Sequence, residues 1–348
     1  MNQASTSQQL LDLSVSVVIP CRNEEQYIRA CVESVVGNDY PKDLLHVLVC
    51  DGQSDDRTRE IVAELSQKHA PVKLVDNPYR TTPYALNLGI REVNSDVAII
   101  LGGHAELAPD YLRECVLQLK AHPEVGCIGG IIDNVAENTT AAIVSKAMAS
   151  SFGVGNAHFR TGGKEGYVDT VAFGAYRREV FEKVGYFDED LTRNQDDEFN
   201  YRVLKGGFKI WLSSKIRSKY YVRASFKKLF RQYFQYGYWK VFVNRKHQAV
   251  TSIRQLVPLG FVLFVLMGGL LAWLHPLLSF GFGSVLALYL ILALLSAFRL
   301  TSNPSTALGV AFTFFILHLG YGLGYLQGIV RFLLLRQQPT KSSARLTR

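Results

Sequence analysis

The segment Val97-Ala98-Ile99-Ile100-Leu101, followed by Gly102-Gly103-His104-Ala105-Glu106, decides the fold that we expect for this chain. Its apolar half predicts a short strand that is buried on both faces, as strands of a parallel sheet are. In an open α/β domain, ligands bind beyond the carboxyl ends of such strands. We therefore expect the Gly-Gly-His-Ala-Glu stretch to lie beside a bound metal ion or diphosphate.

Strand-like and helix-like segments alternate on both sides of this stretch. Residues 14–20, 44–50 and 72–75 predict further buried strands, and the segments between them predict helices, the first of which we expect Asn23 to cap. This β-α-β-α-β-α-β order favours a parallel sheet with helices on both faces, a Rossmann-like α/β fold. Residues 134–166 are Gly-rich and weakly patterned, so there we expect a surface segment rather than a core element.

Charged residues are distributed unevenly along the 348-residue chain. Lys, Arg, Asp and Glu are absent from residues 255–298 and again from 300–330. A stretch of roughly 20 apolar residues is long enough to cross a bilayer. We therefore expect about three transmembrane helices within residues 251–335.

A basic and aromatic segment precedes these apolar stretches. Residues 215–254 contain eleven Lys or Arg and no Asp or Glu, in a chain of formal net charge +8. We expect residues 223–250 to form an amphipathic helix at a membrane surface, with rings at head-group depth and cations near anionic lipid. Packing of this helix on the preceding domain is an alternative compatible with that placement. We expect membrane lipids, and no nucleic acid, as its partner.

These patterns divide the chain into five parts: a flexible N-terminus (1–13), a globular domain (14–222), the amphipathic helix region (223–250), a transmembrane region (251–335) and a basic tail (336–348). The polar N-terminus predicts no secretory signal, so we expect a multi-pass protein of the inner or plasma membrane with a cytoplasmic globular domain. Three spans would place the tail outside, whereas its basic residues favour the inside. A re-entrant or interfacial segment would reconcile the two. The five cysteines match no zinc spacing and are expected to be free thiols.

Polar clusters follow four predicted strands: Pro20-Cys21-Arg22-Asn23-Glu24, Asp51-Gly52-Gln53-Ser54-Asp55, Asn77-Pro78-Tyr79-Arg80 and the Gly102 to Glu106 stretch. Any one such cluster is also typical of a helix cap or a turn. In a parallel sheet, however, their strand ends converge on one crevice. A carboxylate there can accept a hydrogen bond from a base or a ribose, and arginines can bind a diphosphate.

Taken together, these motifs resemble glycosyltransferase family 2, whose members have the GT-A fold. Val17-Val18-Ile19-Pro20-Cys21-Arg22-Asn23-Glu24 resembles the opening strand and P-x-x-N-E turn of that family. Val49-Cys50-Asp51-Gly52-Gln53-Ser54-Asp55-Asp56-Arg57-Thr58 resembles its D-G-S-x-D-x-T turn. Residues 77–87 and 193–202 support similarity to the membrane-attached glucosyltransferases of succinoglycan-type exopolysaccharide assembly. The resemblance covers about residues 14–240.

The resemblance implies an inverting transfer of a sugar from a nucleotide donor, UDP-linked by analogy, to a lipid-linked or polysaccharide acceptor. Such a transfer needs a carboxylate that takes the proton of the acceptor hydroxyl. By this resemblance Asp196, the second residue of the Gln195-Asp196 pair, is the general base. The donor nucleotide would be bound by Pro20, Arg22, Glu24, Asp51, Asn77 and Arg80, and the acceptor side would include Phe173, Gly174 and Asp197.

The expected metal site departs from the family pattern. The family has Asp-x-Asp, or Asp-Ala-His in this subgroup, after the fourth strand, and alignment places Gly102 at the first Asp. His104 and Glu106 then remain as candidate ligands of a divalent Mg²⁺ or Mn²⁺ ion. Three hypotheses stay open: the ion is held by these two residues and the diphosphate, Arg or Lys replaces it, or activity is weak.

Two other functions also stay open. One is a processive polysaccharide synthase, because Gln235-Tyr236-Gly237-Tyr238-Trp239 resembles a Q-x-x-R-W motif in which Tyr238 stands where the Arg belongs. The other is a catalytically lapsed scaffold that binds nucleotide sugars, which Gly102 favours and Asp196 does not.

Overall fold

The computed structural model describes residues 11–163, 165–222, 225–251 and 253–339, which form two compact units. The first unit comprises Met1–Asn134 and His158–Tyr221, and the second comprises Val135–Ala157 and Val222–Arg348. Residues 135–157, which we expected in the globular domain, thus belong to the second unit. Most of the expected flexible N-terminus and basic tail lies outside the described residues.

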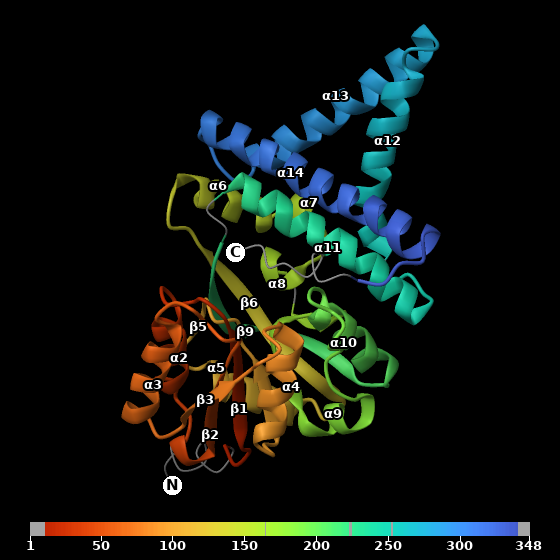
Figure 1. Cartoon of the computed structure of the whole chain (residues 1–348). Coiled ribbons are helices and arrows are strands. Elements are labelled where there is room, and N and C mark those ends of the chain that lie inside the picture. Colours follow the sequence, from red (N-terminus) through yellow and green to blue (C-terminus); the bar gives the residue numbers. More distant parts are fainter. Residues whose placement is uncertain (1–10, 164, 223–224, 252, 340–348) are drawn as a thin grey trace. The chain divides into compact units, whose positions relative to one another are not determined.

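The first unit is built on one mixed sheet in the order β3-β2-β1-β4-β8-β6-β9-β5, with β7 paired to β9 (Figure 1). Four strands are parallel: β1 (Val15–Cys21), β2 (Leu45–Asp51), β3 (Val72–Asp76) and β4 (Val97–Ile100). The others are β5 (Ala105–Leu107), β6 (Val125–Val135), β7 (Gly166–Val168), β8 (Ala172–Arg177) and β9 (Lys209–Tyr221). The β4–β8 pairing is antiparallel, so the sheet changes direction beside β4.

Helices cover both faces of this sheet because its inner strands are apolar on both sides. Val17 and Ile19 pack in one core cluster and Val18 in the other, as the alternation of side chains along a strand requires. The first face is covered by α2 (Ile28–Val36), α3 (Thr58–Lys68) and α5 (Tyr111–Ala121), and the second by α4 (Thr82–Glu92), α9 (Arg178–Val184) and α10 (Gln195–Lys205). Shorter helices are η1 (Lys42–Leu44) and α8 (His158–Thr161).

The first helix begins later than Asn23, so the expected helix cap there is wrong. Asn23 has a left-handed backbone with φ of 55°, and α2 starts only at Ile28. The side chain of Asn23 instead accepts a hydrogen bond from the Asp55 amide, at 3.1 Å. Asn23 therefore stabilises the turn after β2 rather than its own helix.

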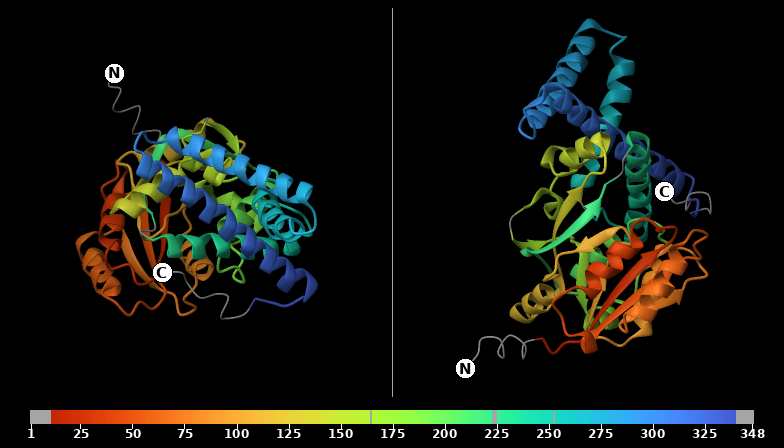
Figure 2. Two further views of the ribbon diagram at one scale, coloured as in Figure 1. Left: turned by 90° about the horizontal axis from the view of Figure 1, so that it is seen from above. Right: turned by 90° about the vertical axis from the view of Figure 1, so that its left-hand side faces the viewer.

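The second unit is helical. It contains α6 (Thr139–Met148), α7 (Ser151–Val154), α11 (Phe226–His247), η2 (Ile253–Leu256), α12 (Val257–Leu271), α13 (Pro276–Phe298), α14 (Pro304–Gly328) and the π-helix η3 (Ile329–Leu334). Within this unit α12 and α13 form a hairpin, and α11 packs along α14 (Figure 2). Among the residues of this unit that the structure describes, three helical segments are long and apolar enough to cross a membrane: Ile253–Leu271, Pro276–Phe298 and Pro304–Leu334.

The expectation of a surface segment over residues 134–166 is wrong for α6. Ala141, Val144 and Ala147 are fully buried, and Ile143 lies against Gly309 of α14. The side chain of Asn138 caps the helix by accepting from the Ala141 amide at 2.8 Å. A stripe formed largely by alanine is too weakly apolar to stand out as a helical period in the sequence.

Candidate active site

The polar clusters after β1, β2 and β3 lie at one edge of the sheet. The strands are in register at that edge, with Cys21 beside Asp51 and Asp51 beside Asp76. The amide of Gly52 donates to the Cys21 carbonyl, and the amide of Asn77 donates to the Asp51 carbonyl, each at 2.8 Å. The structure thus brings together the three clusters that the sequence analysis assigned to the donor nucleotide.

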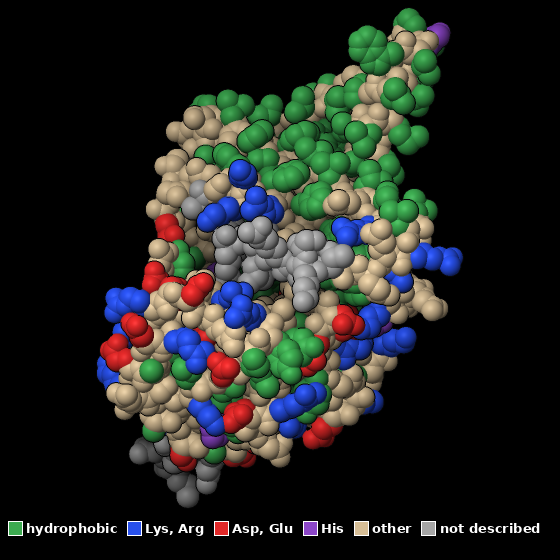
Figure 3. All heavy atoms as spheres, viewed as in Figure 1, with side chains coloured by type: hydrophobic (Ala, Val, Ile, Leu, Met, Phe, Trp, Pro, Cys, Tyr) green, Lys and Arg blue, Asp and Glu red, His purple; other side chains and the backbone are tan. Residues whose placement is uncertain are grey.

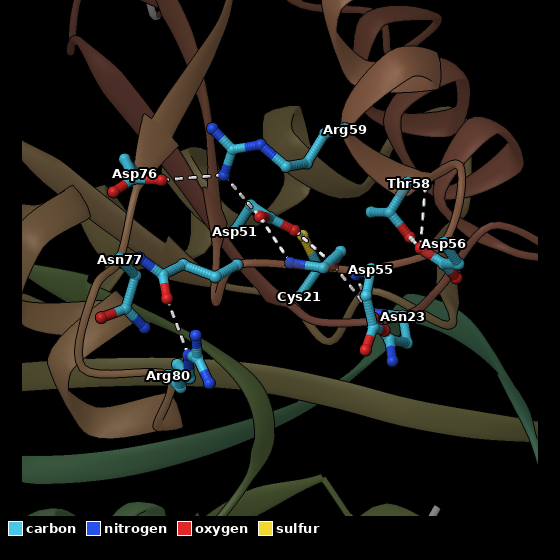
Figure 4. Close-up of polar contacts among 12 residues, drawn as sticks. Cys21, Asn23, Asp51, Asp55, Asp56, Thr58, Arg59, Asp76, Asn77 and Arg80 are labelled. Carbon is cyan, nitrogen blue, oxygen red and sulfur yellow. Dashed lines mark hydrogen bonds and ion pairs between the residues drawn. The ribbon is translucent and has the colours of Figure 1, made fainter.

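Asp51 is the fully buried carboxylate of this edge. It accepts hydrogen bonds from the amide and the hydroxyl of Ser54 and from Arg59 Nη1, the last at 2.7 Å. Arg59 also binds Asp76 at 2.8 Å and so bridges the ends of β2 and β3 (Figure 4). The hydrogen bond to Asp51 is the main cause that raises the pKa of Arg59. Sequence reasoning missed Arg59, because a basic residue in the first turn of an amphipathic helix has no distinguishing pattern.

A second set of contacts joins the turns after β1 and β2. The amide of Glu24 donates to Thr58 Oγ1 at 2.8 Å, and the amide of Thr58 donates to Asp56 Oδ1 at 2.9 Å. Burial raises the pKa of Asp56, but hydrogen bonds from the hydroxyl and the amide of Thr58 outweigh it and lower that pKa overall. The D-G-x-S-x-D-x-T pattern is therefore partly architectural here: Asp56 and Thr58 hold Glu24 in place.

Asn77 and Arg80 have different positions in the third turn. Asn77 is buried, and its side chain donates to the Thr81 carbonyl and accepts from the Tyr79 amide, so it shapes the turn. Arg80 Nε donates to Gln53 Oε1 at 2.7 Å, which places this guanidinium beside the β2 turn. A Cβ at Gly52 would lie 3.3 Å from the Arg80 Cα and 3.4 Å from the Arg22 Cβ. Arg22 and Arg80 therefore flank the glycine of that turn.

The two expected metal ligands have different partners. His104 Nδ1 lies 3.3 Å from Glu24 Oε1, and its ring packs 5.2 Å from the ring of Tyr220. Glu106, on β5, accepts a hydrogen bond from Tyr221 and lies 3.4 Å from Lys219 Nζ. Within the described part of the chain, no three His, Cys, Asp or Glu side chains gather as a metal cluster. His104 instead faces Glu24, which brings one nitrogen and one oxygen donor together in this turn.

Gly102 connects this turn with the expected acceptor side. A Cβ at Gly102 would lie 3.5 Å from the Phe173 ring, an ordinary contact, so space alone does not require glycine here. Phe173 has a left-handed backbone with φ of 49°, and its carbonyl accepts a hydrogen bond from Tyr111 at 2.6 Å. Phe173 and Gly174 are the second and third residues of β8, and the next three residues of that strand pair with β4.

The three acids of α10 differ sharply in burial. Glu198 is buried and binds Arg202 through two hydrogen bonds, of 2.7 and 2.8 Å. Asp196 is exposed and Asp197 half-buried, both in the first turn, where the helix dipole stabilises negative charge. Burial, followed by the charges of Cys127 and Asp196, raises the pKa of Tyr176 on β8. Asp196 therefore lies within electrostatic range of β8, the strand that contains Phe173 and Gly174.

Left-handed backbone conformations concentrate in these turns. Five non-glycine residues in the described part of the first unit have positive φ, between 49° and 63°: Asn23, Gln53, Arg80, Phe173 and Asn194. They belong to the turns after β1, β2 and β3, to the start of β8 and to the N-terminus of α10. Such residues cost about 1–3 kcal/mol each and cluster at functional sites. Backbone strain therefore marks the same turns that the motifs do.

Arg160 of α8 is a second residue that sequence reasoning missed. Its Nη1 is buried and has no hydrogen-bond partner among the described residues. Its guanidinium lies 5.5 Å from the ring centroid of Tyr220, the ring that also packs on His104. The surrounding sequence is weakly patterned and carried no signal for it.

A mixed sheet whose parallel strands end in polar, strained turns at one edge is typical of nucleotide-binding α/β domains, the class to which the nucleotide-sugar glycosyltransferases belong. Sequence comparison agrees, since the family described as Glycosyl transferase family 2 matches residues 16–185. The chain belongs to glycosyltransferase family 2, and the expected resemblance is confirmed.

Two relatives cover most of the chain. A dolichyl N-acetyl-alpha-D-glucosaminyl phosphate 3-beta-D-2,3-diacetamido-2,3-dideoxy-beta-D-glucuronosyltransferase of Methanococcus voltae is 32% identical over 327 residues, 91% of this chain and 97% of its own. The succinoglycan biosynthesis protein ExoA of Rhizobium meliloti is 33% identical over 269 residues, 77% of this chain and 81% of its own. The chain is therefore a glycosyltransferase that uses nucleotide sugars in glycan or exopolysaccharide assembly.

A solved structure supports the fold. The mannosyltransferase PcManGT from Pyrobaculum calidifontis, in complex with GDP-Man and Mn²⁺, superimposes with a TM-score of 0.63 over 93% of each chain, at 17% identity. The expected GT-A fold is confirmed.

Proposed function

We propose that this chain is a membrane-attached, inverting glycosyltransferase that moves one sugar from a UDP-linked donor to a lipid-linked acceptor. The observation that carries this proposal is the convergence of the strained turns after β1, β2 and β3 on one sheet edge. The named activity of the Methanococcus voltae relative, which involves a dolichyl phosphate-linked sugar, supports a lipid-linked acceptor. We place the enzyme in the inner or plasma membrane, with the first unit on the cytoplasmic side.

In this proposal the donor nucleotide lies along the edge formed by β1, β2 and β3. Pro20, Glu24 and Asp51 line the nucleoside, and Asn77 shapes the turn that presents Arg80. Arg22 and Arg80, which flank Gly52, bind the diphosphate. Arg59 orients the Asp51 carboxylate and pairs it with a cation, so this buried acid is not left without a partner.

Transfer needs a base for the acceptor hydroxyl. We assign this role to the Asp196 carboxylate, with Asp197, Phe173 and Gly174 on the acceptor side. As the hydroxyl oxygen attacks the anomeric carbon, its proton passes to Asp196 while the bond to the diphosphate oxygen breaks. The electron pair of that bond leaves with the nucleoside diphosphate, and the configuration at the anomeric carbon inverts.

The leaving diphosphate accumulates negative charge. We propose that a divalent ion, Mn²⁺ or Mg²⁺, is bound by His104 together with Glu24, and that Glu106 supports this turn through Tyr221 and Lys219. When bound, such an ion would neutralise developing charge on the diphosphate. Mn²⁺ in the solved mannosyltransferase complex supports this assignment.

The processive alternative gains no support from the second unit. Tyr238, which stands where the Q-x-x-R-W motif has Arg, is buried, and its ring packs 4.7 Å from the ring of Phe332. That position is part of a helix–helix contact between α11 and η3, so we favour a single transfer.

A donor panel tests the proposed function. We expect the full-length protein in native membranes to release UDP from at least one UDP-sugar in the presence of Mn²⁺ and a membrane lipid extract. We expect GDP-sugars to be inactive, and EDTA to lower the rate at least 10-fold with recovery on added Mn²⁺. Nucleotide release from GDP-sugars alone would contradict the UDP assignment, and full activity in EDTA would contradict the metal assignment.

Arg160 offers a prediction that does not depend on the sugar. We expect Arg160→Gln to weaken UDP binding or raise the KM for the acceptor by about 10- to 100-fold, because a hydrogen bond to a charged group contributes about 1.5–3 kcal/mol. Calorimetry with UDP and acceptor-dependent kinetics show whether Arg160 contributes to binding of the nucleotide or of the acceptor. Arg91→Gln is the matched control, since Arg91 lies on an aromatic ring, that of Tyr186, outside the site. Equal, small effects of both variants would assign Arg160 a structural role only.

A further inference from the structure

We infer that only the α12–α13 hairpin crosses the hydrocarbon core of the membrane. The third helix that is apolar enough to cross, α14, lies instead with α11 in the membrane surface, where the two helices form one interfacial layer against anionic head groups. The inference concerns the second unit alone and does not depend on the proposed sugar transfer.

The first observation is the close backbone contact between α11 and α14. A Cβ added at Gly320, Gly324 or Gly328 would press on the carbonyl oxygens of Phe230, Phe234 and Tyr238, respectively, at 3.1 Å for the first and 2.8 Å for the last. The register advances by four residues on both helices, so they run parallel. Glycines at this spacing allow two helix backbones to touch. Because the contact extends over several turns, α11 and the second half of α14, from about residue 316 onward, occupy the same depth.

The second observation is that the charges of α11 exclude it from the hydrocarbon core. Lys227, Lys228 and Arg231 are exposed at one end and Arg245 and Lys246 stand at the other, whereas Lys240, between them, is buried. The stretch 232–244, between Arg231 and Arg245, has 13 residues, which is about 20 Å of helix at 1.5 Å per residue. The core is roughly 30 Å thick. Because α11 is too short between its cations to cross the core, it stays at the membrane surface. Its contact with α14 then keeps α14 at the surface as well.

Hydrogen bonds also tie the end of the α14 segment to the basic end of α11. Arg245 Nη1 donates to the carbonyls of Phe332 at 3.1 Å and Gln337 at 2.9 Å. Asn244 Nδ2 donates to the Tyr325 hydroxyl at 2.9 Å. If α14 crossed the membrane and ended on the far side, these hydrogen bonds would require the Arg245 guanidinium to lie on the far side as well. The contacts therefore place residues 325–337 at the same head-group level as Arg245.

The hairpin has the opposite character. In the most apolar 18-residue stretch of each of its two segments, Ile253–Leu271 and Pro276–Phe298, only 6% of the residues are buried by the rest of the protein. In the α14 segment the corresponding share is 50%. The 19 and 23 residues of the two hairpin segments correspond to about 28 and 34 Å, enough for the roughly 30 Å core. Apolar side chains cover the face of the hairpin seen in Figure 3. Trp273 at the tip is 91% exposed, and Trp favours the membrane interface, so the tip reaches the far head groups.

Two crossings return the chain to the side from which it entered. Arg299, directly after α13, and Arg331 and Arg336, after α14, then share a side with the cations of α11. This arrangement satisfies the preference of basic residues for one side of the membrane, which three spans would violate. The interfacial segment that the sequence analysis left open is, in this inference, α14.

Cysteine accessibility in sealed membrane vesicles tests the topology, with Leu274→Cys at the tip, Ser302→Cys between α13 and α14, and Gln338→Cys after η3. All three positions are exposed. The wild type is the matched background, because its five cysteines are buried and burial raises the pKa of Cys50 to about 12, which keeps that thiol unreactive. The reagent is a membrane-impermeant maleimide, applied before and after permeabilisation.

We expect positions 302 and 338 to be labelled from one side and position 274 only from the other. Labelling of positions 338 and 302 from opposite sides would show that α14 crosses, and would overturn the inference. Labelling of position 274 from the same side as 302, or its protection even after permeabilisation, would equally overturn the crossing of the hairpin.

Discussion

Replacing Asp196 by Asn lowers the sugar-transfer rate by about 10²- to 10⁴-fold, the contribution of a positioned general base, and leaves UDP binding intact. The amide has nearly the shape of the carboxylate but cannot take the proton of the acceptor hydroxyl. Because Asp196 is exposed in the first turn of α10, we expect the variant to fold normally. The measurements are the single-turnover rate with saturating donor and the Kd for UDP.

Glu179→Gln is the matched control for this variant. Glu179 is also an exposed carboxylate in the first turn of a helix, α9, and forms an ion pair at 3.8 Å with Arg177. We expect its transfer rate to match the wild type. If Asp196→Asn turned over at the wild-type rate, the base would have to be another residue. If it lost UDP binding as well, Asp196 would act on the donor rather than on the acceptor.

Arg202→Met is expected to cause the largest loss of stability, about 3–5 kcal/mol, because it leaves the buried Glu198 carboxylate without its cation. The Glu198 side chain is only 1% exposed. Arg202 also donates to the carbonyls of Val184 at 2.6 Å and Tyr186 at 2.8 Å, so the substitution leaves these two oxygens unpaired as well. The measurement is the urea concentration at which half of the full-length protein is unfolded in detergent, with unfolding monitored by pulse proteolysis.

The matched control removes an arginine from an exposed ion pair. Arg57 and Glu60 have exposed side-chain fractions of 75% and 74%, and such pairs contribute at most about 1 kcal/mol. Arg57→Met should therefore shift the midpoint little. Similar losses in both variants would mean that Glu198 becomes protonated or hydrated when Arg202 is removed, and that its burial is not rigid.

The parallel half of the sheet could be predicted from the sequence because its strands are continuous apolar runs ended by turn residues. Other features depend on contacts that sequence does not display. The α6 helix relies on alanines that become apolar contacts only when α14 covers them. The late start of α2 depends on Asn23, whose side chain stabilises a neighbouring turn instead of its own helix.

The sequence allowed us to predict which turns form the candidate site, but not which side chains contact one another there. The motifs located Asp51 and His104 at strand ends, where the structure places them. That Asp51 is neutralised by Arg59, and that His104 faces Glu24 rather than sharing a partner with Glu106, follows from side-chain geometry across different elements. Arg59 and Arg160 were missed because a single basic residue on a helix is ordinarily a solvated surface residue.

The glycine contact between α11 and α14 also has a consequence for the order in which the protein is assembled. Phe230 is synthesised 90 residues before Gly320, which at 5–20 residues per second is a delay of roughly 5–18 s. During that time the buried face of α11, including Trp239 and Val243, has no α14 to cover it. The hairpin must insert before α14 can return to that face. Burial of this face of α11 therefore has to wait for the synthesis of α14, and a chain that stops before α14 leaves the apolar face of α11 exposed.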